Sequence, residues 1–320
     1  MSSAQIRKPA PVTLEDRFVG CLLGHMLGDA LGAPFEGLPP ETIYYDFGPA
    51  RRLFERPPDA TLPYTDDTQM TIGVAECLLE CGGIDAEILA GRFRDNYEPW
   101  RGYGPGTRKL LDAMGAGAEW RSMTGGAFAG GSLGNGAAMR AAPVGLLFHL
   151  DLDRVCDEAR RSAVLTHAHP IGIDGAVLMA AAVALVVAAD AFDRRVFFDE
   201  LGRRAATEEF QWQLRTAARL GPDDSLTFGN SLEAHRWVTT ALTCFAFSPD
   251  SYEDAVGRAI AMGNDTDTLA AMAGSLSGAY LGPGALPLVV LAAVEDGAKG
   301  RTYVEGLARE LYRKCGVVPR

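Results

Sequence analysis

Apolar residues recur at helical spacing along most of the chain, and the apolar–polar alternation typical of strands is nearly absent. The first helical pattern begins after Thr13 and includes Phe18, Leu22, Leu23, Met26 and Leu27. Thr13 with Asp16 three positions later is an acidic variant of the capping box, which marks a helix start. We expect this helix to end near Ala33 and Pro34.

Small residues form a second pattern on the same helix. Gly20, Gly24, Gly28 and Gly32 recur every four positions, so they lie on one helix face. A face without side chains lets another helix approach closely. Asp29 follows one of these glycines, which fits a buried structural role at least as well as a ligand role.

The remaining patterns predict further helices as far as the C-terminus. Pro143 is expected to kink one of them, and Asn230 with Glu233 forms a capping box for another. No linker, composition break or fixed-period repeat divides the chain. We therefore predict one all-α domain over residues 13–320, with about a dozen helices, preceded by a loose tail over residues 1–12. The internal helices are expected at 70–79, 86–96, 109–114, 137–147, 153–165, 175–189, 194–219 with a break, 252–262 and 269–280.

The charge of the chain argues against nucleic-acid binding. The formal net charge is −11, the pI is about 5.0, and basic residues occur as scattered pairs without a run of five. Affinity for nucleic acid depends on basic residues that contact phosphates. An anionic small substrate remains compatible with this charge if a metal ion supplies positive charge locally.

The sequence also predicts the location of the protein. Six cysteines are spread without a C-x-x-C motif, which is typical of reduced thiols. Residues 1–12 lack the apolar core of a signal peptide. The longest apolar run, 176–189, is too short to span a bilayer and is expected to be a buried helix. We predict a cytoplasmic protein that does not bind a membrane.

Two short acidic stretches stand out, each just ahead of an apolar helical run. The first acidic stretch is Thr65–Asp66–Asp67–Thr68, and the second acidic stretch is Asp265–Thr266–Asp267–Thr268. Helix N-termini stabilise carboxylates by up to about 1 kcal/mol each. Either stretch alone is explained by helix capping. Two of them in one chain favour a shared site for a hard divalent cation, which prefers several oxygen ligands.

Two other segments have candidate chemistry. Residues 125–136 are the most glycine-rich part of the chain and lead into a helix, so their backbone N–H groups are placed to bind phosphate, although such loops are often only tight turns. His167 and His169 lie two residues apart. With no cysteine or third histidine nearby, hydrogen bonding or helix capping is favoured over a zinc site.

The chain resembles the ADP-ribosylglycohydrolase family, which includes the dinitrogenase-reductase-activating glycohydrolases and the ADP-ribosyl-acceptor hydrolases. The resemblance covers residues 20–284, and in this order its motifs are highly specific. It implies an all-α fold with two magnesium ions in a central cleft, where ADP-ribose is released from a modified group. The matching segments are GCLLGHMLGDALGAPFEG, YTDDTQM, WRGYGPGT, GGSLGNGAAMRAAPVG, THAHPIGIDGA and MGNDTDTLAAMAGSLSGAYLG.

The resemblance also implies a role for individual residues. The metal ligands for two Mg²⁺ ions, or Mn²⁺ in their place, fall on Thr65, Asp66, Asp67, Asp265, Asp267, Thr268 and, on a mobile loop, Glu36. The expected catalytic residues are Glu36, Asp66 and Asp267. The expected substrate-binding residues are Gly102, Tyr103, Gly131, Ser132, Gly134, Asn135, Gly136 and His167, with the glycine loop holding the pyrophosphate. The chain departs from the family pattern at Asn264, usually a glycine, and at Leu133, where some relatives have an aromatic residue near the adenosine.

The implied reaction builds positive charge at the anomeric carbon of ribose, which nearby carboxylates stabilise. The substrate would be an ADP-ribosylated protein or a small ADP-ribose conjugate, bound by a monomer. Two alternatives stay open: a magnesium-dependent nucleotide phosphoesterase and a silent ADP-ribose-binding protein, although the complete ligand set argues against silence. The sequence leaves the leaving group open among arginine, serine, acetate and another ADP-ribose, with the segment around His167 leaning towards an O-linked group.

Overall fold

The computed structural model describes residues 12–48, 50–54, 60–123, 131–221, 228 and 233–316. All regular structure in these residues is helical, and only two isolated bridges pair Leu62 with Val294 and Gly134 with Glu233. The all-α prediction is confirmed. The α-helices are α1 (Leu14–Gly32), α2 (Pro40–Phe47), α3 (Asp66–Cys81), α4 (Ala86–Asn96), α5 (Pro105–Gly115), α6 (Trp120–Met123), α7 (Gly136–Met139), α8 (Ala142–Leu147), α9 (Leu152–Ala163), α10 (Pro170–Ala188), α11 (Arg194–Arg204), α12 (Glu208–Ala217), α13 (Ala234–Phe247), α14 (Tyr252–Ala261), α15 (Thr266–Leu281), α16 (Leu288–Leu291) and α17 (Arg301–Cys315), with 3₁₀ turns η1 (Ala33–Phe35), η2 (Ala50–Phe54) and η3 (Pro283–Ala285).

Helix α1 begins where its capping residues predict. The Thr13 hydroxyl accepts a hydrogen bond from the Asp16 N–H, and the Asp16 carboxylate accepts one from the Thr13 N–H, so both halves of the capping box are present. The helix ends at Gly32, and Pro34 lies in the turn η1 that follows. Residues 1–11 of the expected tail lie outside the described residues.

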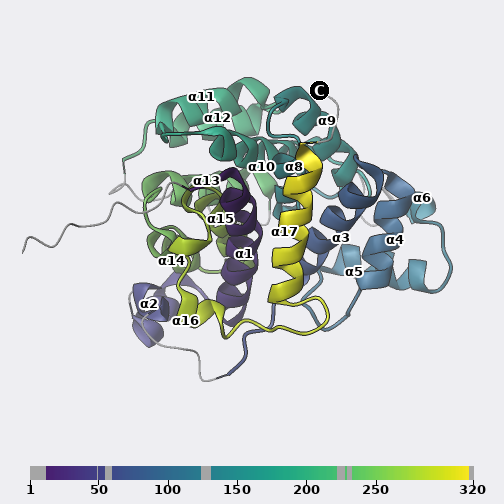
Figure 1. The fold of residues 1–320 in the computed structure, drawn as a ribbon, viewed down its shortest axis with the longest axis horizontal. Helices are drawn as coiled ribbons and strands as arrows, with labels where there is room; N and C mark the ends of the chain where they lie inside the picture. Colours follow the sequence, from purple (N-terminus) through teal and green to yellow (C-terminus); the bar gives the residue numbers. More distant parts are fainter. Residues whose placement is uncertain are drawn as a thin grey trace, which may run out of the picture.

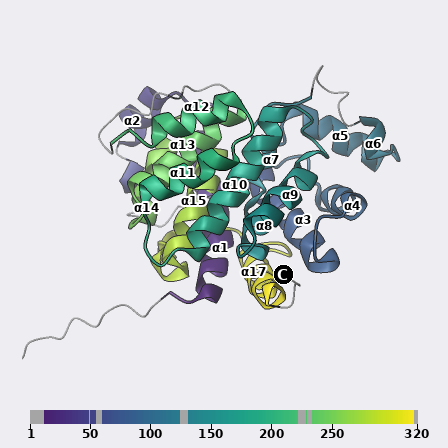
Figure 2. The ribbon, with the colours of Figure 1, turned by 90° about the horizontal axis from the view of Figure 1, so that it is seen from above.

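The glycine face of α1 packs against α15 (Figures 1 and 2). A Cβ added at Gly24 would lie 2.4 Å from the carbonyl oxygen of Gly274, closer than real Cβ contacts come. The other three glycines of the pattern face Gly278, Ala270 and Thr266 in the same way. The two helices are therefore antiparallel, and the start of α15 lies beside the end of α1. This contact confirms the expected close approach of a second helix.

Among the described residues, two core helices are long and apolar enough to cross a membrane by length and composition alone. They are residues Leu14–Phe35 and α10, and 89% and 83% of their most apolar parts are buried inside the protein. Helix α10 has 19 residues, so the prediction that the apolar run is too short to span was wrong. The other helices bury both segments, which places them in the hydrophobic core as expected.

Two predicted helices differ in the structure, and a third is broken as expected. The helix expected over 137–147 is broken at Arg140 and Ala141 into α7 and α8, and Pro143 lies in the first turn of α8. The expected break within 194–219 separates α11 from α12. Asn230 lies outside the described residues, and Glu233 occupies the N-cap position of α13 without a side-chain cap, so it is not a third helical residue.

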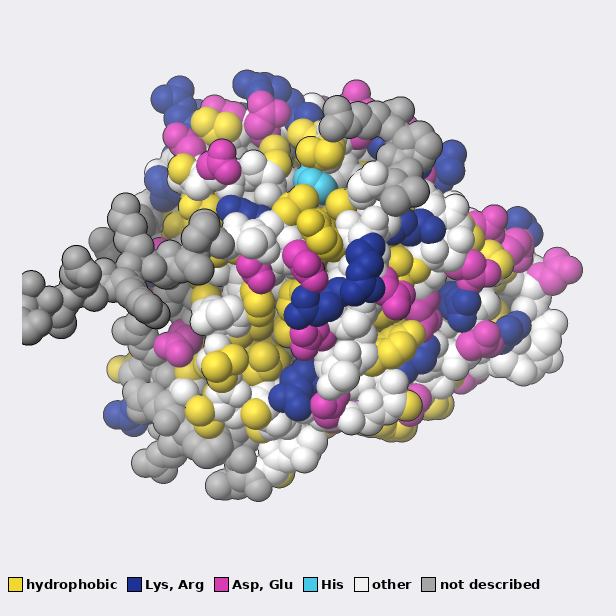
Figure 3. Space-filling view, viewed as in Figure 1, with side chains coloured by type: hydrophobic (Ala, Val, Ile, Leu, Met, Phe, Trp, Pro, Cys, Tyr) yellow, Lys and Arg dark blue, Asp and Glu magenta, His cyan; other side chains and the backbone are white. Residues whose placement is uncertain are grey.

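The helices form two groups on either side of α1 and α10. Helices α13, α14 and α15 lie on one side, and α3, α4, α5 and α6 lie on the other, in both views (Figures 1 and 2). On the face drawn in Figure 3, basic side chains are interspersed with acidic ones and form no large patch of one sign.

Candidate functional site

The first acidic stretch begins α3. Thr65 is the N-cap residue, and its hydroxyl accepts a hydrogen bond from the Asp67 N–H at 3.3 Å. Asp66 and Asp67 belong to the first helical turn, so all of the stretch except the N-cap residue Thr65 lies inside the helix. The Asp66 N–H donates to the Arg101 carbonyl at 2.7 Å, which brings the segment containing Gly102 over the helix start.

Asp29 of α1 holds the start of α3 in place through hydrogen bonds. Its carboxylate accepts hydrogen bonds from the Thr65 N–H at 3.0 Å, the Thr65 hydroxyl at 2.8 Å and the Thr68 N–H at 3.0 Å. Asp29 is fully buried, and this burial raises the pKa of its carboxyl to about 6 although the threonines stabilise the charged form. The structural role considered for Asp29 is therefore the one that the structure supports.

The second acidic stretch begins α15 but is held differently. Asp265 occupies the N-cap position without a side-chain cap, while the Thr266 hydroxyl donates to the Gly32 carbonyl at 2.8 Å. The Asp265 carboxylate accepts a 2.6 Å hydrogen bond from the side-chain amide of Asn135. Asp265 is therefore tied to the glycine-rich loop before α7, and capping does not explain its carboxylate.

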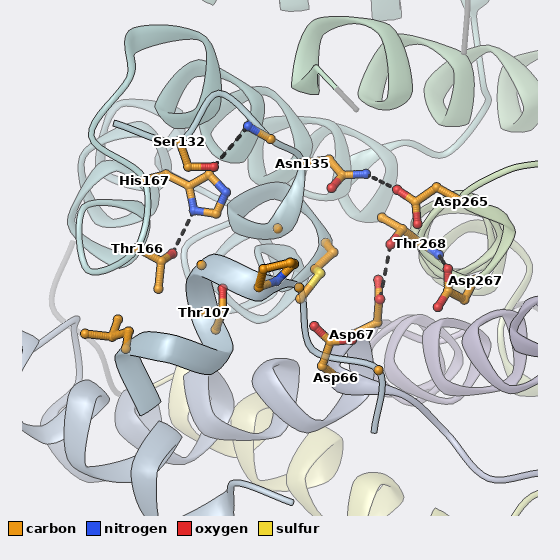
Figure 4. Close-up of a pocket in the computed structure, with 18 of the residues that line it drawn as sticks. Asp66, Asp67, Thr107, Ser132, Asn135, Thr166, His167, Asp265, Asp267 and Thr268 are labelled. Atoms are coloured by element: carbon orange, nitrogen blue, oxygen red, sulfur yellow. Dashed lines mark hydrogen bonds between the residues drawn. The ribbon is translucent and has the colours of Figure 1, made fainter. Parts of the chain in front are cut away.

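The two acidic stretches meet. The Thr268 hydroxyl donates to Oδ2 of Asp67 at 3.2 Å, across 201 positions of sequence. Figure 4 shows Asp66 and Asp67 facing Asp265, Asp267 and Thr268. The antiparallel packing of α1 on α15 produces this meeting, because Asp29 near the end of α1 carries the start of α3.

A cleft of about 570 Å³ opens beside this meeting point. Thr65 and Tyr103 do not line it: the Thr65 hydroxyl is bound to Asp29, and the buried Tyr103 hydroxyl donates to Gln69 at 2.7 Å. Leu133 also lies outside it and packs against the core. The expected site residues that line the cleft are Glu36, Asp66, Asp67, Gly102, Gly131, Ser132, Gly134, Asn135, Gly136, His167, Asp265, Asp267 and Thr268.

One end of the cleft is strongly acidic. Burial and, after it, the neighbouring carboxylates raise the pKa values of Asp66, Asp67 and Asp267 well above the ordinary range. Burial and the charges of Asp265 and Asp29 also raise the pKa of Glu36. None of the described residues lining the cleft is lysine or arginine. The carboxylates therefore face one another without a positive side chain between them.

This donor set fits a divalent cation. Oδ1 of Asp67 is buried without a hydrogen-bond partner, and the surrounding side chains offer carboxylate and hydroxyl oxygens. Such hard oxygen ligands suit Mg²⁺ or Mn²⁺. In the described part of the chain, no group of three or more Asp, Glu, His or Cys side chains is already arranged around a metal position.

The other end of the cleft consists of backbone and neutral donors. Figure 4 places Ser132, Thr166 and His167 there, away from the aspartates. Ser132 Oγ accepts from the Gly134 N–H at 3.3 Å, and the loop leads into α7, a helix of only four residues. His169 caps α10 by accepting from the Ile171 N–H at 3.2 Å. The two histidines therefore have separate partners, as the capping interpretation predicts.

Three residues or segments of the cleft region were not predicted from the sequence to belong to the site. The start of α5, with Thr107, lines the cleft, and the glycine followed by Pro105 signals a helix start there. Asn264 lines it in a left-handed conformation, with φ of 62°. Arg140 is completely buried behind the cleft, and a lone charge within an apolar run was its only signal.

Comparison with known proteins agrees with these observations. Residues 10–319 match the family model described as ADP-ribosylglycohydrolase. The chain belongs to the ADP-ribosylglycohydrolase family. The resemblance stated from the motifs is thereby confirmed, and membership makes this chain a glycohydrolase enzyme.

Relatives span nearly the whole length of this family member. ADP-ribosylhydrolase ARH3 of Danio rerio is 32% identical, with 97% of this chain and 94% of the relative covered. ADP-ribosylhydrolase ARH3 of Homo sapiens is 31% identical, with 93% of each covered. A solved structure titled ADP-ribosylglycohydrolase-related protein complex superposes with a TM-score of 0.73 at 27% identity, covering 94% of this chain and 99% of that chain.

Proposed function

We propose that the protein is a magnesium-dependent hydrolase that releases ADP-ribose from an ADP-ribosylated protein side chain or a small ADP-ribose conjugate. The observation that carries this proposal is the cleft in which the two acidic stretches meet at one end and a glycine loop with His167 lies at the other. An ADP-ribose unit matches both ends of this cleft. Its ribose, whose anomeric carbon reacts, fits the acidic end, and its pyrophosphate fits the glycine loop. The relatives named ADP-ribosylhydrolase support the same substrate class.

The proposed ligands of two Mg²⁺ ions are Asp66, Asp67, Asp265, Asp267 and Thr268, with Glu36 from the neighbouring loop and Thr65 as the seventh candidate. Thr65 has the weakest claim, because its hydroxyl already donates to Asp29. When bound, the ions would supply Lewis-acid chemistry that orients ribose hydroxyls and lowers the pKa of a water molecule. Mn²⁺ offers the same coordination to oxygen ligands.

In the proposed reaction, water attacks the anomeric carbon while the bond from that carbon to the leaving group breaks. The transition state resembles an oxocarbenium ion, and the carboxylates at the acidic end stabilise its positive charge. One of Glu36, Asp66 and Asp267 takes the proton from water, and the leaving group takes up a proton as it departs. The pyrophosphate lies along Gly131, Ser132, Gly134, Asn135 and Gly136, with Gly102 and His167 as further contacts.

Product analysis tests this proposal. We expect free ADP-ribose as the product when the protein is incubated separately with arginine-modified and serine-modified substrates. AMP or phosphate as the product would instead establish a phosphoesterase, and no product from any ADP-ribose conjugate would establish a silent binding protein. The substrate that turns over also identifies the linkage, for which the segment around His167 favours serine or another O-linked group.

Metal removal tests the cofactor. After EDTA treatment and dialysis, we expect turnover to be lost and to return with Mg²⁺ or Mn²⁺. The melting temperature should also fall in EDTA, since a ligand that binds only the folded state stabilises it by mass action, by about 2.7 kcal/mol at one hundred times its Kd. Full activity in the dialysed protein would contradict the metal proposal.

A further inference from the structure

Arg140 is a buried cation without a carboxylate partner among the described residues. It is 0% exposed, and its guanidinium donates to the Gly136 carbonyl at 2.9 Å, the Ser162 carbonyl at 3.1 Å and the Thr166 hydroxyl at 2.8 Å. Its Nε is buried without a partner. Burying a charge in this way is costly for folding. The contacts lead to two elements of the cleft, the glycine loop and His167.

Thr166 connects Arg140 to the ring of His167. The Thr166 hydroxyl oxygen lies 2.7 Å from Nδ1 of His167. Arginine has no acceptor, so it occupies a lone pair of the Thr166 oxygen and leaves the hydroxyl proton free to be donated. Nδ1 is the acceptor at hydrogen-bond distance. The burial of His167 and the charge of Arg140 lower the pKa of the His167 ring to about 3, so the ring is neutral. With Nδ1 as the acceptor from Thr166, the single ring proton lies on Nε2.

The Nε2 atom lies beside the glycine loop. A Cβ added at Gly136 would lie 3.5 Å from it, and one added at Gly172 would lie 2.6 Å from the Ser132 carbonyl oxygen and 3.0 Å from Cδ2 of His167. The ring is 4% exposed and lines the cleft, and Nε2 has no hydrogen-bond partner among the described residues. The ring and the loop are thus packed as one unit, with a neutral N–H donor left for a ligand.

We propose that Arg140 is a positioning residue that, through Thr166, fixes His167 as a donor at Nε2 towards a phosphate oxygen of the substrate. This inference rests on the proposed function, because the pyrophosphate of ADP-ribose supplies the acceptor. The hydrogen bond from Arg140 to the Gly136 carbonyl holds the loop in the same geometry. Its buried positive charge lies behind the phosphate end, where the cleft itself has no basic side chain.

Nitrogen NMR of the histidines tests the arrangement without any substrate. The chain has five histidines, and the spectrum of His167→Gln assigns the signal of His167. We expect the wild-type ring at neutral pH to carry its proton on Nε2 with Nδ1 unprotonated. In Thr166→Val the ring should lose this single tautomer. A proton on Nδ1 in the wild-type protein would overturn the proposal.

Calorimetry with ADP-ribose and with adenosine tests the consequence for binding. Thr166→Val should weaken ADP-ribose binding at least about 10-fold, the loss expected for a hydrogen bond to a charged group, and leave adenosine binding unchanged. Arg140→Met should weaken ADP-ribose binding further. The affinity of Arg140→Lys should lie between those of Thr166→Val and Arg140→Met, because lysine keeps the charge but not the planar fork of the guanidinium.

The matched control is Thr243→Val. Thr243 is fully buried, whereas Thr166 is half-buried, and the Thr243 hydroxyl donates to the Thr239 carbonyl within α13. The same substitution there removes a hydroxyl that has no contact with Arg140 or His167. Wild-type affinity in Thr166→Val, or an equal loss for adenosine, would overturn the positioning role. Failure of the wild-type protein to bind ADP-ribose would overturn the proposed function instead, and the NMR result would still decide the tautomer.

Discussion

The starts of α3 and α15 carry nearly the same residues, yet different parts of the protein hold them. At α3, Thr65 caps the helix and the buried Asp29 accepts hydrogen bonds from Thr65 and Thr68. At α15, Asp265 makes no side-chain cap and instead accepts from Asn135 of the glycine loop. The start of α3, which we call the α3 half of the acidic end, is therefore fixed from the core. The start of α15, the α15 half, is linked to the segment proposed to hold the pyrophosphate.

This difference assigns the two other acidic residues near the site, Asp29 and Glu36, to different halves. Asp29 supports the α3 half without lining the cleft, whereas Glu36 belongs with the α15 half. The Gly37 N–H donates to the Asn264 carbonyl at 2.7 Å and the Asn264 N–H donates to the Leu38 carbonyl at 2.8 Å, so the loop of Glu36 is attached to the residue just before Asp265. Substitutions in the two halves should therefore have different effects.

The largest effect is expected from removing one aspartate of either half. Asp66→Ala and Asp267→Ala should each lower turnover by about 10²–10⁴-fold, the range for a lost acid–base group, with a nearly unchanged far-UV circular dichroism spectrum. Both side chains line the cleft and neither is the N-cap of its helix. Unfolding of both variants would show that capping is their main role.

The contrast between the halves is sharpest with Asp29→Asn. This variant should weaken Mg²⁺ binding by about 10- to 100-fold, the usual cost of losing a residue that orients metal ligands. Its urea midpoint should fall as well, because the buried hydrogen bonds to Thr65 and Thr68 are weakened. A loss of turnover as large as that of Asp66→Ala, with unchanged metal affinity, would contradict this supporting role.

Glu36→Gln tests the loop of the α15 half. We expect ADP-ribose binding to be retained, or tightened because a competing negative charge is removed, while hydrolysis falls at least about 10²-fold. Calorimetry with ADP-ribose and a turnover assay on the same variant measure both quantities. Binding that collapses together with turnover would make Glu36 a structural ligand and exclude a gating loop.

The acidic end should make the metal-free protein more stable as the pH falls. The pKa values of Asp66, Asp67 and Asp267 are raised in the folded state, so the folded protein binds more protons than the unfolded chain and gains stability as pH drops through these values. The buried His25 and His167 have lowered pKa values in the folded protein, so they reduce its stability as the pH falls. This opposing effect begins only below about pH 6.5, the ordinary histidine pKa.

Urea unfolding in EDTA at about pH 8 and about pH 6.5 measures this effect, and the midpoint should be higher at the lower pH. Saturating Mg²⁺ should weaken or reverse the trend, because metal ligands must be deprotonated. The matched variant is Asp66→Asn, which should show a smaller change in EDTA. If the urea midpoint decreased equally with and without Mg²⁺ when the pH is lowered, the carboxylates would not repel one another enough in the folded protein to raise their pKa values.

The smallest effect is expected at Asn264. Asn264→Gly should change the free energy of unfolding by no more than about 1 kcal/mol, in the stabilising direction, since it removes a left-handed side chain and a buried amide nitrogen without a partner. Gly263→Ala is the matched opposite: its φ is 71° and a Cβ would lie 2.7 Å from the Leu38 carbonyl oxygen, so it should destabilise. Thermal unfolding of both variants compares them.

The sequence by itself determined the helices and much of the chemistry at their ends. Spacing and caps are local properties, so Thr13 marks the start of α1, and the four glycines mark a face that packs closely on another helix. The two acidic stretches could be recognised as a pair because their residue types are rare in combination. Their motif context also identified the family.

Only the tertiary structure shows the contacts that bring these residues together. The contact between Thr268 and Asp67 joins residues 201 positions apart, and it depends on how α1, α3 and α15 pack. The same applies to Asp29, whose side chain accepts hydrogen bonds from the start of a different helix. It also applies to Arg140, which lies at the break between α7 and α8 and donates hydrogen bonds to α9 and to Thr166. Local spacing specifies a helix, but the acceptors of a buried charge are supplied by the segments that pack around it.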